Sequence, residues 1–124
     1  MKVLIVDDSR VLRMHLRTMM QGMGWVCEEV DSGTAALERM QAGSQISLML
    51  LDVNMPGMSG IECLRAMREM PHSDQVKAMM VTTESEAPLI SVALNLGADE
   101  FLMKPFTRES LVSKLLMMGL PVSL

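Results

Sequence analysis

The 124-residue chain has little of several features that define common protein classes. It has no apolar run near the ~18 residues that a membrane-spanning helix needs, so we expect no membrane insertion. It also has no basic excess, because 11 Lys and Arg residues stand against 15 Asp and Glu residues, giving a net charge of −4. Nucleic-acid-binding domains usually carry a basic surplus, and we therefore expect no nucleic-acid partner.

Cysteine and histidine are scarce as well, with two residues of each. Cys27 and Cys63 lie far apart without a CxxC spacing, which favours two reduced, buried thiols over a redox pair. His15 and His72 have no partners at the spacing of a zinc site. The chain reaches Asp7 too early to hold the apolar core of a secretory signal. Together these features favour a cytoplasmic protein.

What the chain does contain is a regular alternation of apolar runs with segments of helical period. The expected strands are residues 3–6, 25–30, 48–51, 78–81 and 101–103. We expect helices to begin near Ser9, Ser32, Ser59, Pro88 and Thr107, with Pro88 in the first helical turn. The apolar positions expected to face the core are Leu12, Leu16, Met19, Met20, Met23, Ala36, Leu37, Met40, Ile61, Leu64, Met67, Leu111, Leu115 and Leu116.

Alternation of this kind predicts an α/β fold, a doubly wound (βα)5 parallel sheet with helices on both faces and right-handed crossovers. The second run carries Glu28 and Glu29, which is typical of a strand at a sheet edge. The length suits one domain over residues 1–124.

Polar residues directly follow four of the apolar runs. Asp7 and Asp8 follow the first, and Asp52, Thr82 and Lys104 follow the third, fourth and fifth. Because parallel strands end at one edge of a sheet, where open α/β sheets bind ligands, we expect these side chains to converge. Two carboxylates ~4 Å apart repel by about 4 kcal/mol at an effective dielectric constant of 20, so a cation is expected among them.

Mg²⁺ suits this set because it is a hard ion that prefers oxygen ligands. Together with Lys104 it would neutralise three carboxylates and leave the pocket able to receive an anion. One carboxylate can then attack phosphorus and form an aspartyl phosphate. The alternative is that each acid merely ends a strand in a solvated loop, which does not readily account for all of them together.

With these residues in place, the chain resembles the response-regulator receiver domains, most closely the stand-alone CheY-like chemotaxis regulators. The resemblance covers essentially the whole chain. Its motifs are Val6-Asp7-Asp8-Ser9, Leu51-Asp52-Val53-Asn54-Met55-Pro56-Gly57-Met58-Ser59-Gly60, Val81-Thr82-Thr83-Glu84, Gly97-Ala98-Asp99-Glu100-Phe101 and Lys104-Pro105-Phe106-Thr107.

The resemblance implies a flavodoxin-like, CheY-like fold with strand order 2-1-3-4-5 and a specific role for each site residue. Asp52 would be the phosphoacceptor. Asp8, Asp52 and the backbone carbonyl of Asn54 would ligate Mg²⁺, for which Mn²⁺ is a possible substitute, and Asp7 would act through a metal-bound water. The further implied roles are a hydrogen bond from Thr82 to the phosphoryl group, pairing of Lys104 with it, a cis Lys104–Pro105 peptide, and tuning of dephosphorylation by Asn54 and Glu84.

The resemblance also implies partners and an output surface. The phosphodonor would be a sensor histidine kinase or a phosphotransfer domain, and the effector a protein such as a flagellar switch component. The signal would pass from Thr82 to Phe101 and the face made by the fourth helix, fifth strand and fifth helix. CheY has a tyrosine where this chain has Phe101, so coupling through a hydroxyl is in doubt here. The alternative for Phe101 is simple core packing.

Two surface features have two interpretations each. Arg10, Arg13 and Arg17 recur at helical spacing, either as a solvated face or as a docking surface for an acidic kinase or phosphotransfer domain. The 16 methionines mostly occupy core spacings. Met55 and Met58 in the loop after Asp52 are instead expected to be partly exposed at a partner surface.

Several other functions compete with this one. A receiver domain is not a turnover enzyme, although it would catalyse its own phosphorylation and slow autodephosphorylation. A phosphate shuttle or sink, and a receiver cut from a longer regulator, are close alternatives. A metal-dependent phosphatase with an Asp nucleophile usually has a second acid two residues later, where this chain has Asn54. A flavodoxin-like cofactor binder needs a phosphate-cradling loop after the first strand, where Asp7 and Asp8 would repel phosphate.

Overall fold

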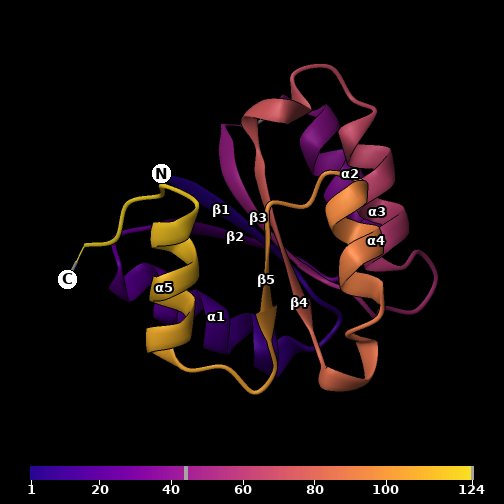
Figure 1. Ribbon diagram of the computed structural model, residues 1–124. Helices are drawn as coiled ribbons and strands as arrows, with labels where there is room; N and C mark the ends of the chain where they lie inside the picture. Colours follow the sequence, from indigo (N-terminus) through magenta and orange to yellow (C-terminus); the bar gives the residue numbers. More distant parts are fainter. Residues whose placement is uncertain (44, 124) are drawn as a thin grey trace.

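The computed structural model describes residues 1–43 and 45–123 and contains one parallel sheet between two layers of helices (Figure 1). The strand order is β2-β1-β3-β4-β5, as the resemblance implied. The strands are β1 (Lys2–Val6), β2 (Val26–Val30), β3 (Ile46–Asp52), β4 (Lys77–Thr82) and β5 (Glu100–Met103). The polar strand β2 lies at one edge, which confirms that prediction.

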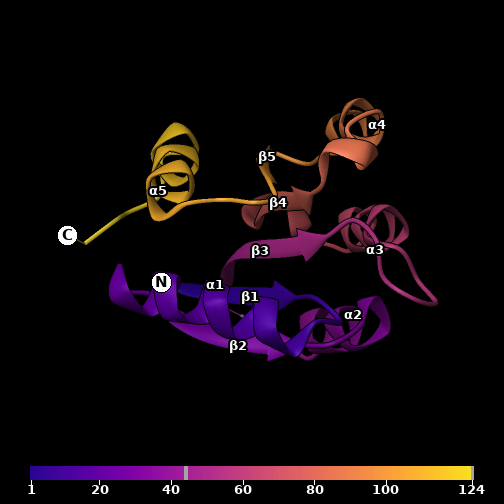
Figure 2. The same ribbon diagram turned by 90° about the horizontal axis from the view of Figure 1, so that it is seen from below.

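Helices follow each strand and cover both faces of the sheet. They are α1 (Arg10–Gly22), α2 (Gly33–Gln41), α3 (Gly60–Arg68), α4 (Leu89–Asn95) and α5 (Arg108–Met117), with short 3₁₀ turns η1 (Ser73–Gln75) and η2 (Glu84–Glu86). Figure 2 shows α1 and α5 on one face and α2, α3 and α4 on the other. In the described part of the chain, no helix combines the length and apolarity needed to cross a bilayer.

The predicted helix starts rest on local hydrogen bonds that the structure contains. The side chains of Ser9, Ser32, Ser59 and Thr107 each accept a hydrogen bond from the backbone N–H three residues later. These bonds satisfy donors that a helix start otherwise leaves free. The fourth helix differs, because the chain first forms η2 and Pro88 then occupies the N-cap, one residue before the first helical turn.

Alternate residues of the strands supply two separate cores, one on each face of the sheet. On the first face, strand residues such as Leu4 and Met49 pack with α2, α3 and α4 through a cluster that includes Ala36, Leu64 and Ala93. On the other face, the strands pack with α1 and α5 through a cluster that comprises Val3, Ile5, Leu16, Met20, Met23, Trp25, Cys27, Leu48, Leu50, Met79, Val81, Leu102, Leu111, Leu115 and Leu120. Both cysteines are free and buried, as predicted.

Two predictions about single side chains are wrong. Leu116 was expected in the core but is 60% exposed, because Leu111 and Leu115 already define the face of α5 that meets the sheet. Met55 was expected to be partly exposed but is only 5% exposed, since its side chain packs into the same cluster as Val53 and Leu64. Met58 is half-buried, as predicted.

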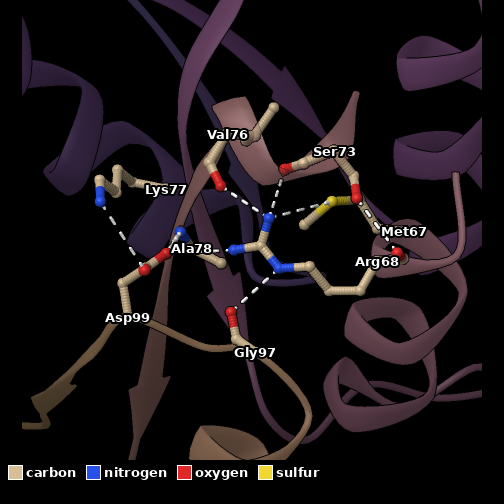
Figure 3. A network of polar contacts seen from close by, with 8 residues as sticks. All are labelled: Met67, Arg68, Ser73, Val76, Lys77, Ala78, Gly97 and Asp99. Carbon is tan, nitrogen blue, oxygen red and sulfur yellow. Dashed lines mark hydrogen bonds and ion pairs between the residues drawn. The ribbon is translucent and has the colours of Figure 1, made fainter. Parts of the chain in front are cut away.

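Near the amino-terminal ends of β4 and β5, Arg68 connects α3 to the start of β4 and to the segment before β5 (Figure 3). Its guanidinium donates to the carbonyls of Ser73, Val76 and Gly97 and pairs with Asp99 at 3.1 Å. The same carboxylate oxygen of Asp99 accepts the backbone N–H of Ala78. Only a planar group with several fixed donors can serve this many acceptors at once.

Candidate functional site

Three carboxylates meet at the carboxyl ends of β1 and β3, the neighbouring strands between which the strand order reverses. Oxygen atoms of Asp7, Asp8 and Asp52 all lie within 4.8 Å of one another. Asp7 and Asp52 are 2% and 4% exposed, whereas Asp8 is exposed to solvent. The predicted convergence of the acids is therefore present, with one open side.

Asp7 is the carboxylate least served by the protein itself. Its Oδ1 accepts the backbone N–H of Ser9 at 2.8 Å, but its Oδ2 is buried and has no hydrogen-bond partner among the described residues. Burial is the main cause that raises the pKa of Asp7 above its usual range, and the nearby Asp8 adds to it. A buried oxygen without a donor is a position that a cation or a water bound to it satisfies, so this donor set fits a hard ion such as Mg²⁺.

Asp52 is held by Lys104, which arrives from the loop after β5. The Lys104 ammonium donates to Asp52 Oδ1 at 2.9 Å. Burial raises the pKa of Asp52, the hydrogen bond from Lys104 opposes that rise, and the charge of Asp7 reinforces it. The Lys104–Pro105 peptide bond is cis, as the resemblance implied.

The main chain at Asp52 is fixed by an unusually close approach of α3. The Gly60 N–H donates to the carbonyl of Val53 at 2.9 Å. A Cβ atom at Gly60 would lie 2.0 Å from the carbonyl oxygen of Asp52. Only glycine fits here, which gives this residue of the quoted motif a specific role in placing the candidate acceptor.

Thr82 ends β4 one residue beyond Val81, which is paired with Asp52 in the sheet. Its side chain is fully buried, and its hydroxyl donates to the Thr83 carbonyl at 3.2 Å. Phe101 lies on β5, half-buried against the core of the α2–α3–α4 face, with the Lys114 ammonium 4.1 Å from its ring centroid. The predicted switch pair therefore lies on neighbouring strands, and its coupling stays a prediction.

The remaining predicted residues lie around this pocket in different environments. Asn54 is exposed in the loop after β3, and Glu84 is exposed at the start of η2. Arg13 and Arg17 are not a solvated face, because both form ion pairs with Glu29 on β2. Arg13 also donates to the backbone carbonyl of Asp7 at 2.7 Å, so it fixes the main chain of this acidic residue.

Sequence reasoning missed Glu86, which accepts hydrogen bonds from the residue after Thr82. The Thr83 N–H donates to Glu86 Oε1 at 2.8 Å. The segment Thr83-Glu84-Ser85-Glu86 has the Ser/Thr-x-x-Glu spacing of a capping box, which was the available signal. The structure shows such a box at the start of η2.

The sequence model described as the response regulator receiver domain matches residues 3–116. The chain belongs to this family. This receiver domain is 35% identical over 116 residues to the chemotaxis protein CheY of Pseudomonas aeruginosa, and the match covers 93% of each chain. It resembles the solved structure of Vibrio cholerae chemotaxis protein CheY4 with a TM-score of 0.86 and 33% identity, over 94% of this chain and 96% of that one.

The same fold also occurs inside longer proteins. This receiver domain matches a probable two-component response regulator/GGDEF domain protein with a TM-score of 0.84 and 29% identity, over 91% of its own length and 46% of the other chain. Membership of the family places the receiver domain in two-component signalling, close to chemotaxis regulators.

Proposed function

We propose that this receiver domain accepts a phosphoryl group on Asp52 in a Mg²⁺-dependent reaction and signals by changing its affinity for a protein partner. The phosphodonor is a sensor histidine kinase or a phosphotransfer domain, and the process served is chemotaxis, with a flagellar switch component as the effector. In this role the domain is a cytoplasmic signalling module whose own catalysis is limited to its phosphorylation and autodephosphorylation.

The observation that carries the proposal is the arrangement around Asp52. Its carboxylate is buried, touches the Lys104 ammonium at 2.9 Å and shares a 4.8 Å cluster with Asp7 and Asp8. Asp8, Asp52 and the carbonyl of Asn54 would hold Mg²⁺ directly, and Asp7 would hold it through water. The ion would supply positive charge to the oxygens of the transferring phosphoryl group.

The chain's own residues supply the rest of the chemistry. A carboxylate oxygen of Asp52 forms a bond to phosphorus while the bond between phosphorus and the donor breaks, so the phosphoryl group moves without net oxidation. Lys104 neutralises charge on the phosphoryl oxygens, as it already does for the Asp52 carboxylate. The Thr82 hydroxyl donates a hydrogen bond to the phosphoryl group once its side chain rotates toward it.

The output follows from the change in charge. Phosphorylation replaces one negative charge on Asp52 with roughly two and adds strong acceptor oxygens. Movement of the buried Thr82 toward them leaves space that Phe101, on the adjacent strand, fills. Because Phe101 has no hydroxyl, the coupling to the face of α4, β5 and α5 is steric.

Kinase docking remains assigned to α1, in a changed form. Arg13 and Arg17 form ion pairs with Glu29, whereas Arg10, the first residue of α1 and two residues after Asp8, is exposed. Arg10 is therefore the member of the three best placed to meet an acidic partner directly. Arg13 and Arg17 contribute by fixing the helix against β2.

The decisive experiment is incubation with acetyl phosphate and Mg²⁺ followed by intact-mass measurement. The wild type should gain one labile phosphate, and Asp52→Asn should gain none. Asp31→Asn is the matched control. Asp31 directly follows the carboxyl end of β2, as Asp7 follows that of β1, but it is exposed and lies outside the cluster of three carboxylates. It should be phosphorylated as the wild type is, and chelation of Mg²⁺ should abolish the reaction. Phosphorylation of Asp52→Asn at the wild-type rate would refute the assignment.

A further inference from the structure

The turn that follows β4 holds a half-buried carboxylate, Glu86, that the proposed chemistry does not use. Its Oε1 accepts the Thr83 N–H at 2.8 Å and the Thr83 hydroxyl at 3.0 Å. The Thr82 hydroxyl lies 3.5 Å from the same oxygen. One oxygen thus gathers donors from two consecutive residues, and one of these is the threonine that would contact the phosphoryl group.

The Thr82 hydroxyl has one proton to donate, so its acceptors compete for it. In this structure the acceptors are the Thr83 carbonyl at 3.2 Å and Glu86 Oε1 at 3.5 Å. Both belong to the turn after β4 and neither belongs to Asp52. Because Thr82 is fully buried, water does not compete, and its hydroxyl must leave these acceptors before it can reach a group on Asp52.

The negative charge of Glu86 also favours its displacement when Asp52 is phosphorylated. Glu86 lies close enough to Asp52 that its carboxylate contributes, after burial and nearer groups, to the raised pKa of Asp52. A phosphorylated Asp52 carries more negative charge than the free carboxylate. Repulsion of Glu86 therefore increases on phosphorylation, while its attraction for the Thr83 donors is unchanged.

From these contacts we infer that Glu86 is a positioning residue that holds the Thr82 hydroxyl away from Asp52 in the unphosphorylated protein and is displaced when Asp52 is phosphorylated. The inference rests on the proposed function, since it takes Asp52 as the acceptor. Displacement of Glu86 also frees the Thr83 N–H and opens the capping box of η2. The turn that leads into α4 would then change shape together with Thr82.

The test is a double-mutant cycle on the rate of phosphorylation by acetyl phosphate with Mg²⁺, followed by intact mass. Glu86→Gln keeps the size and one acceptor oxygen but removes the charge, and Thr82→Val keeps the shape but removes the hydroxyl. We expect Glu86→Gln to react about two- to tenfold faster than wild type, the range that one modest hydrogen bond covers. We expect Thr82→Val to react more slowly, and Glu86→Gln to accelerate the reaction less in the Thr82→Val background than in the wild type.

Glu62→Gln is the matched control, because Glu62 accepts the Ser59 N–H at 3.1 Å in the capping box of α3 and has no contact with Thr82. Its rate should equal that of the wild type. Glu86→Ala provides a second variant that should also accelerate the reaction, and thermal unfolding checks that each variant is folded.

The outcomes separate the two proposals. Equal rates for wild type and both Glu86 variants would overturn the inference and leave phosphorylation of Asp52 intact. The same acceleration in the Thr82→Val background would also overturn it, because charge repulsion alone would then explain the effect. A wild type that gains no phosphate would overturn the proposed function, and the inference with it.

Discussion

The contact between Gly60 and the main chain of Asp52 allows a sharp prediction. In Gly60→Ala the added Cβ would lie 2.0 Å from the Asp52 carbonyl oxygen and 2.9 Å from the Asp52 carbonyl carbon and the Val53 Cα. Contacts of Cβ below 3.0 Å essentially do not occur, so α3 and the end of β3 must separate by about 1 Å. Both partners are backbone, and no side chain can yield instead.

Two magnitudes follow from that displacement. Overpacking of this kind typically costs about 1–3 kcal/mol, and the lower chain entropy of alanine returns roughly 0.5–1 kcal/mol. We therefore expect Gly60→Ala to lose about 1–2 kcal/mol of unfolding free energy in urea titrations. A displacement of ~1 Å at a reacting group costs on the order of 100-fold in rate. We expect a loss of that order in phosphorylation by acetyl phosphate.

Gly22→Ala is the control for this experiment. Gly22 is the last residue of α1, and a Cβ added there meets nothing within 4 Å. Alanine at that position should leave the phosphorylation rate unchanged and preserve or raise stability by up to about 1 kcal/mol. If Gly60→Ala matched the wild type in both stability and rate, the close approach would not be what positions Asp52.

Three other predictions concern stability. In metal-free buffer, Asp7→Asn should raise the unfolding free energy by about 1–3 kcal/mol, since it removes one of three clustered charges and relieves an unpartnered buried oxygen; a less stable variant in EDTA would contradict this. The pKa of Glu28 is lowered from 4.5 to about 2, chiefly by its hydrogen bond from Arg39. The folded state therefore binds a proton at Glu28 less tightly than the unfolded chain does. The stability that the ionised Glu28 contributes is complete above about pH 4.5 and is lost as the pH falls toward about 2. Glu28→Gln should accordingly lose less stability than the wild type over that window, and parallel urea titrations at several pH values would show equal losses if the pair were irrelevant. Arg68→Lys should cost about 1–3 kcal/mol because a lysine cannot serve the four groups that Arg68 contacts, whereas Arg65→Lys on the exposed face of α3 should be neutral; similar unfolding midpoints for both would exclude a structural role for the Arg68 network.

Local features were predictable because their causes lie within a few residues. Ser9, Ser32, Ser59 and Thr107 begin helices through hydrogen bonds to residues three positions later, and the sequence contains both partners. The same reasoning applied to Thr83 and Glu86 identifies the capping box of η2, although its nearness to Thr82 depends on where β4 ends.

Predictions about the surroundings of single side chains failed where those surroundings depend on residues from other parts of the chain. Leu116 has the residue type of a core position, but Leu115 precedes it and the helix turns Leu116 toward solvent. The charges of Arg13 and Arg17 suggest a solvated face, yet Glu29 on β2 binds both. Periodicity predicts which residues share a face, but not which partner that face meets.

The amino-acid sequence by itself determined the alternating elements, the parallel sheet and the convergence of Asp7, Asp8, Asp52 and Lys104, because a series of βα units favours parallel strands and the chain places these polar residues at or just beyond their carboxyl ends. Only the tertiary structure decided that Asp7 is buried with one unpartnered oxygen while Asp8 faces solvent. It also decided that Lys104 holds Asp52 and that Gly60 packs against the main chain of that residue. The physical reason is that desolvation and hydrogen bonding depend on what packs around an atom, and those neighbours come from segments far apart in the sequence.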